Sequence, residues 1–164
     1  MNWLEWLEST PPSTWVRETE ALLGLPGMLF LHTVGMGLLV GTSLVIGLRV
    51  MGATPQLPLP LFARFRPLIG WGVIINVVSG LALLLAYPTK ALTNPMFYAK
   101  LAFILIATLA WRSVMLTAFS GATPAVVTAR TRRIMLLALF SWFAAVLCGR
   151  LLAYTYRHLM ANSP

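Results

Sequence analysis

Four long apolar runs constrain the fold of this chain more than any other feature of its sequence. They cover about residues 22–50, 68–86, 96–119 and 134–156, and short polar or proline-rich segments separate them. An α-helix needs about 20 mainly apolar residues to cross the hydrocarbon of a bilayer. Backbone groups in lipid must find hydrogen-bond partners within the protein, so each run is expected to be helical. The sequence therefore predicts an all-α domain over residues 22–164, an integral membrane four-helix bundle.

The N-terminal segment, residues 1–21, has a different pattern. Tryptophan and leucine recur at helical spacing from Trp3 to Leu7, opposite Glu5 and Glu8. A short amphipathic helix of this kind lies in the membrane interface and does not cross the bilayer. The segment lacks the basic start, the continuous apolar stretch and the cleavage site of a secretory signal. We expect an N-terminal interfacial amphipathic helix that ends at the two consecutive prolines.

The charges are few and basic, which bears on partners and orientation. The net charge is +8, yet only 10% of the residues are charged, against about 25% in soluble domains. No basic patch with interleaved aromatic residues indicates a nucleic acid partner, so the lipid bilayer is the expected one. Six arginines lie near the first and third connections: Arg49, Arg64, Arg66, Arg130, Arg132 and Arg133. The positive-inside rule then predicts that both termini are periplasmic.

The acidic residues exclude several kinds of function. All four are glutamates at or before residue 20, so the spans contain no carboxylate. That excludes a carboxylate proton relay, an acid/base pair of carboxylates and acidic ligands for hard cations. Enzymatic activity by this chain alone is therefore not expected. The single cysteine, Cys148, excludes an internal disulfide, and its apolar surroundings predict a small buried side chain.

Two ionisable side chains inside the spans form the candidate site. His32 lies seven residues after Leu25 and Arg150 six before Tyr156. If those residues mark the hydrocarbon boundary, both groups lie roughly 10 Å deep, in one layer. Arg150 stays protonated with no carboxylate in the spans. It either snorkels to the head groups, donates to backbone carbonyls, or binds an anion such as a lipid phosphate, a haem propionate or a partner's carboxylate.

His32 itself has three interpretations. The first is a b-type haem ligand, the second is a copper ligand, and the third is a histidine that forms a hydrogen bond to another helix. Gly35, on the next turn, lets either a neighbouring helix or a flat macrocycle approach. Tyr154 and His158 follow Arg150 at intervals of four and share its helix face. His158 is then either the second axial haem ligand or an exposed interfacial side chain.

Met28 and Met36 flank His32 at a spacing of four, which suits Cu(I) but is also typical of packing.

Gly37 and Gly41 form a GxxxG motif that predicts helix packing, and a mid-span asparagine, Asn76, is expected to hold helices together. The tryptophans near span ends, Trp142 included, are expected to anchor the membrane interfaces.

Four short motifs carry a resemblance to known proteins. They are Leu31–Gly35 in the first span, Ser79–Leu81 in the second, Asn94–Lys100 at the start of the third and Gly149–Tyr154 at the end of the fourth. Over about residues 25–156 the chain resembles a family of small, uncharacterised four-helix bacterial membrane proteins. That family is distantly similar to the membrane domains of copper-resistance protein D and cytochrome b561. The resemblance implies a bacterial inner (cytoplasmic) membrane and makes haem b or copper a candidate cofactor.

These observations leave three functional hypotheses. The first is a b-type haem-binding or redox-associated membrane subunit, with His32 as iron ligand and Arg150 at a propionate. The second is a non-catalytic accessory subunit of a larger membrane complex, in which Arg150 and the glycine face meet a partner protein or further copies of this chain. The third is periplasmic-side copper handling by Met28, His32 and Met36.

Overall fold

The computed structural model describes residues 3–20, 24–118 and 127–161, with side chains to Leu152 and that of Tyr154. This part of the chain is helical and contains no strand. The elements are α1 (Trp3–Glu8), α2 (Pro11–Glu18), α3 (Leu25–Met36), the π-helical η1 (Gly37–Gly41), α4 (Thr42–Met51), the 3₁₀-helical η2 (Leu59–Phe65), α5 (Arg66–Ala86), α6 (Pro88–Leu92), α7 (Pro95–Ala118) and α8 (Ala129–Ala161).

Within the described residues, four stretches are long and apolar enough to span a membrane: Leu25–Met51, Leu59–Ala86, Pro95–Ala118 and Ala129–Leu152. The prediction of an all-α, multi-pass membrane protein is confirmed. The fourth helix begins earlier than expected, because the Oγ1 atom of Thr128 accepts the backbone N–H of Thr131 at 3.2 Å and caps its start. The arginines expected in the connection before it therefore lie on the first turns of α8.

The N-terminal segment contains the expected short helix, α1, which ends before the two prolines, and a second short helix, α2, which begins at them. The consecutive prolines begin α2, since a proline at the first helical position loses no hydrogen bond. The Ser13 hydroxyl donates to the carbonyl of Leu85 at 2.8 Å, and the Arg17 guanidinium donates to that of Ala86 at 3.5 Å. These carbonyls belong to the last turn of α5 and have no partner within the helix. α2 thus caps the end of α5.

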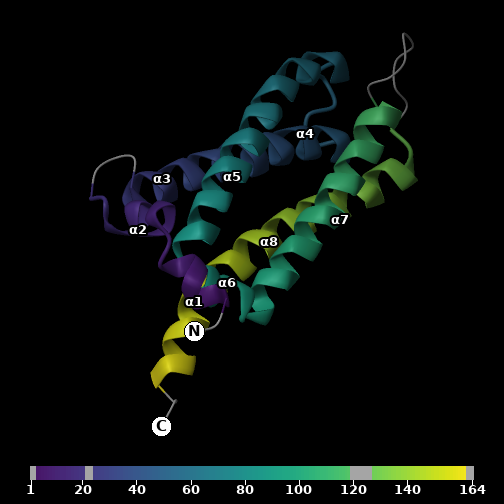
Figure 1. The fold of residues 1–164 in the computed structure, drawn as a ribbon. Coiled ribbons are helices and arrows are strands. Elements are labelled where there is room, and N and C mark those ends of the chain that lie inside the picture. The colour runs from purple at the N-terminus through teal and green to yellow at the C-terminus, as the bar shows by residue number, and fades with distance from the viewer. Residues whose placement is uncertain (1–2, 21–23, 119–126, 162–164) are drawn as a thin grey trace.

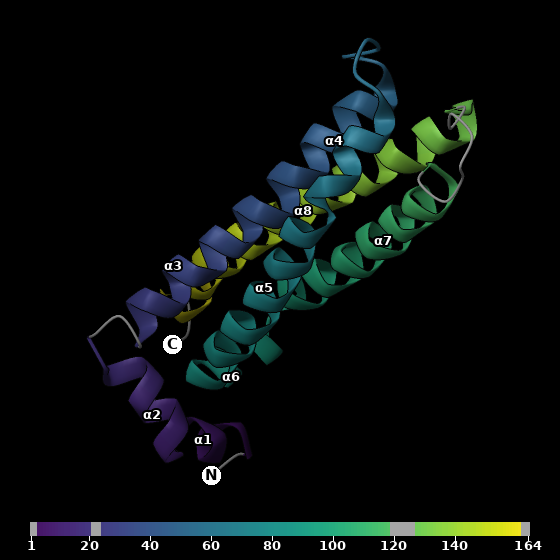
Figure 2. The ribbon, with the colours of Figure 1, turned by 90° about the horizontal axis from the view of Figure 1, so that it is seen from above.

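The long helices pair as two hairpins (Figures 1 and 2). α3 packs on α5, and α7 packs on α8. The first span changes partner at η1: its first half, α3, lies on α5, whereas its second half, α4, lies on α8. Figure 1 shows α3 and α8 diverging from the region where α4 meets α8.

Close helix contacts are made at glycines other than those of the GxxxG motif. A Cβ atom on Gly72 of α5 would lie 2.9 Å from the backbone nitrogen of Leu39 and 3.1 Å from the carbonyl oxygen of Gly35. A Cβ atom on Gly37 or Gly41 would meet nothing within 4 Å. Gly37 and Gly41 therefore do not pack on another helix within the described part of this chain; Gly35 and Gly72 bring the two backbones together instead, and contact of the GxxxG face with a partner stays a prediction.

The apolar core lies at one end of the bundle. We call this the closed end, where α4 and α7 end and α5 and α8 begin. Its core includes Ile46, Val50, Val114, Met135 and Trp142, none more than 5% exposed. Trp142 is therefore a core residue, and its predicted role as an interface anchor is wrong.

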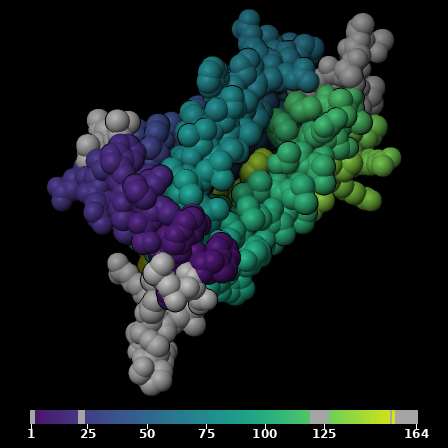
Figure 3. Space-filling model, in the orientation of Figure 1, coloured from purple at the N-terminus to yellow at the C-terminus, as the bar shows by residue number. Residues whose placement is uncertain are grey.

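At the opposite, open end the hairpins separate. Figure 3 shows a hollow between α5 and α7, with α8 at its floor. The chain thus combines a packed apolar half with a half in which polar side chains reach between the hairpins.

Candidate functional site

His32, Ser79 and Lys100 form a chain of hydrogen bonds between the two hairpins at the open end. The Ser79 hydroxyl donates its one hydrogen to the backbone carbonyl of Ile75 at 2.6 Å, so it has no hydrogen left to donate to His32. It lies 3.0 Å from Nδ1 of His32 and must accept a hydrogen from that nitrogen. Nδ1 therefore carries the proton, and Nε2 presents its lone pair to Nζ of Lys100, 3.5 Å away.

The start of α7 sets the position of Lys100. The side chain of Asn94 accepts the backbone N–H of Met96 at 2.9 Å, and Pro95 is the first helical residue. An asparagine cap followed by a proline at the first helical position is a typical helix start. Lys100 follows Pro95 by five residues, about 8 Å along the helix, which brings its amine level with His32.

Two glycines leave room for this arrangement. A Cβ atom on Gly80 of α5 would lie 3.4 Å from Cε1 of His32. A Cβ atom on Gly149 of α8 would lie 3.7 Å from both Cε and Nζ of Lys100. The site therefore draws on four helices, with side chains from α3, α5 and α7 and a bare backbone position on α8.

The site has a cation but no matching anion in the spans. No ion pair to Lys100 forms among residues 24–118 and 127–152, and no Asp or Glu occurs in those ranges. The one described partner of its amine is an imidazole nitrogen, which is a neutral acceptor in the tautomer that Ser79 imposes. A half-buried ammonium in such surroundings favours an anion supplied from outside the spans.

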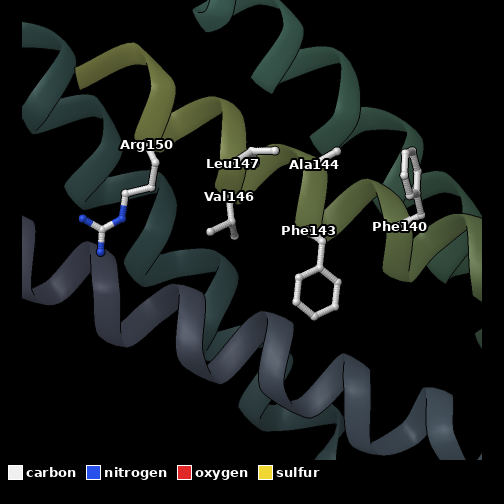
Figure 4. A pocket seen from close by; sticks show the side chains of 6 residues that line it. All are labelled: Phe140, Phe143, Ala144, Val146, Leu147 and Arg150. Carbon is white, nitrogen blue, oxygen red and sulfur yellow. The ribbon is translucent and has the colours of Figure 1, made fainter. Parts of the chain in front are cut away.

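Arg150 does not meet His32 in the structure. Its side chain is exposed, leaves α8 one residue after Gly149, and makes no hydrogen bond or ion pair within the described part of the chain. Figure 4 shows it on the α8 face that carries Phe143 and Val146. Lys100 occupies the position beside His32 that the sequence led us to expect for Arg150.

The other predicted site residues are spread apart. Gly35 packs on Asn76 of α5, where a Cβ atom would lie 2.6 Å from the amide nitrogen, so it serves helix packing. Tyr154 is 62% exposed. Met28 and Met36 are half-buried, and their role as copper ligands stays a prediction. The backbone of His158 belongs to α8, but its side chain lies outside the described residues.

Two residues of the site were missed as functional candidates in the sequence. Lys100 lies near the start of its span, where a basic residue is ordinary, although its distance from Pro95 gives it the depth of His32. Ser79 has no acidic partner and was not considered as an orienting group. Asn76 lies at the contact of α3 and α5, as expected, but its amide donates to the Gly72 carbonyl of its own helix at 2.9 Å, so it contributes there by packing on Gly35.

Comparison with protein-family models, curated proteins and solved structures finds no match to this chain.

Proposed function

We propose that the protein is an accessory membrane subunit that binds a carboxylate- or phosphate-bearing ligand at the amine of Lys100, next to His32. The observation that supports this most directly is the partner of the Lys100 amine. Its nitrogen lies 3.5 Å from Nε2 of His32, and the spans around it supply no carboxylate. The attraction between opposite charges adds to a hydrogen bond from an ammonium to an anion and is absent from its bond to a neutral imidazole, so an incoming anion would replace the imidazole as partner.

The remaining residues would hold the site in shape while the anion binds. Ser79 anchors Nδ1 of His32, so the ring keeps its orientation when Lys100 moves away from Nε2. The hollow between α5 and α7 offers a path from the bilayer to the site (Figure 3). As the resemblance implies, we place the protein in a bacterial inner membrane, and the positive-inside rule puts this open end at the periplasmic side.

Replacing Lys100 by methionine tests the proposal. We expect the affinity for decanoate and decyl phosphate to fall about 10- to 100-fold, because a hydrogen bond to a charged group contributes about 1.5–3 kcal/mol. Titration calorimetry on the protein in zwitterionic nanodiscs measures the affinity for each ligand. Arg112→Met is the control, because Arg112 is an exposed cation near the other end of the same helix. Equal affinity of Lys100→Met and wild type, or equal binding of uncharged decanol, would contradict the proposal.

A b-type haem is the second candidate ligand, and the Ser79 contact favours it. A metal-binding histidine usually donates its other ring N–H to an acceptor, as Nδ1 does here at 3.0 Å. The residues fit haem only if Lys100 leaves Nε2, where its amine now lies, and turns to a propionate. When bound, haem would supply one-electron transfer.

The absorption spectrum decides between these ligands. Haem binding predicts a Soret band in the purified protein, lost in His32→Ala and retained in Ser79→Ala with a shifted reduction potential. If protein incubated with haem and freed of unbound haem shows no Soret band, haem is excluded as the ligand. Binding of decanoate by the same preparation would still support the anion site at Lys100.

A further inference from the structure

A shallow groove runs along one face of α8 toward the open end. It is lined by Phe140, Phe143, Ala144, Val146, Leu147 and Arg150 (Figure 4). All but the last are apolar, and Phe143 and Leu147 are 53% and 59% exposed. The groove therefore presents an apolar floor that ends in a single guanidinium.

The length of the groove matches one leaflet of a bilayer. Phe140 and Arg150 are ten residues apart, which is about 15 Å along an α-helix. The hydrocarbon core of a bilayer is about 30 Å thick, so one leaflet contributes about half of that. The groove is thus about as long as one leaflet, and the long side chain of Arg150 can extend its guanidinium outward to the head groups.

The charge at the end of the groove selects an anionic head group. Arg150 has no hydrogen-bond or ion-pair partner within the described part of the chain, and the spans contain no carboxylate. A guanidinium forms paired hydrogen bonds with phosphate oxygens and is more weakly hydrated than an ammonium. A phosphodiester at the membrane surface satisfies this geometry, and the attached acyl chain covers Phe143 and Leu147.

We propose that this groove is a binding site for one anionic phospholipid of the leaflet at the open end, with its phosphate on Arg150 and an acyl chain along Phe143 and Leu147. The site is separate from the one between His32 and Lys100. Positions 149 and 150 leave α8 about 100° apart, so Lys100, against Gly149, and Arg150 lie on different sides of the helix.

Native mass spectrometry of the detergent-purified protein tests this site. With added phosphatidylglycerol, we expect wild type to retain one lipid, and Arg150→Gln to reduce that retention about tenfold. Arg133→Gln is the charge control, since Arg133 is an exposed arginine on the first turns of the same helix. Leu147→Ser should also weaken retention, whereas Leu109→Ser should not, although both leucines are 59% exposed.

The comparison of ligands completes the test. Phosphatidylglycerol should outcompete phosphatidylcholine, and inorganic phosphate should not displace it, because it lacks the acyl chain. The proposal would be overturned if Arg150→Gln retained as much phosphatidylglycerol as wild type, or if Leu147→Ser retained as much as Leu109→Ser. A homodimer whose interface covers Leu147 would also overturn it. Decanoate binding at Lys100 should be unchanged in Arg150→Gln, so the two sites succeed or fail separately.

Discussion

Replacing Trp142 by alanine is expected to lower the free energy of unfolding by about 3–5 kcal/mol. The indole is 5% exposed and belongs to the core that joins α4, α7 and α8 at the closed end. Because lipid tails are as apolar as the core, helix association in a membrane depends on packing contacts, and truncation removes many of them at once. Unfolding by added sodium dodecyl sulfate in mixed micelles measures the change.

The matched control is Trp71→Ala. Trp71 lies on α5 and is 60% exposed, so its loss should change stability by less than about 1 kcal/mol. If both substitutions cost the same, Trp142 does not hold the bundle together in the way that its burial indicates.

Replacing Gly72 by alanine is expected to destabilise the pair of α3 and α5 by about 1–3 kcal/mol. The added Cβ atom would lie 2.9 Å from the backbone nitrogen of Leu39, and backbone cannot move aside as the end of a side chain can. The same unfolding titration measures the loss.

Gly70→Ala provides the comparison on the same helix. A Cβ atom there meets nothing within 4 Å, and alanine is a better helix former than glycine by up to about 1 kcal/mol. We therefore expect Gly70→Ala to be neutral or stabilising. A loss of stability in both variants would indicate that helix contact at Gly72 is not the cause.

The sequence predicts the class of fold well because its signals are local. Apolar length determines which segments cross the membrane, and the pair Asn94–Pro95 marks the start of α7. The burial of Cys148, 8% exposed, also follows from its apolar surroundings. None of these predictions requires knowing which helices are neighbours.

The site was harder to predict because it depends on helix pairing. Each span is apolar on nearly all sides, so no polar stripe shows which face turns inward. Depth alone allowed either Lys100 or Arg150 to lie beside His32, and both are in the same layer. The choice depends on the faces that α7 and α8 turn toward α3, and the rotation of those helices is set by contacts such as Gly72 with Leu39.

The π-helical turn at Gly37–Gly41 has a consequence for how the two ends of the bundle are connected. A π-helical turn accommodates one residue more than the α-helix around it, and one residue corresponds to a rotation of about 100° about the axis. The extra residue thus offsets the contact face of α3 from that of α4, which lets one span pack on α5 in its first half and on α8 in its second. A single inserted residue thus lets one continuous span contribute Ile46 and Val50 to the apolar core in its second half and present His32 to the site in its first half.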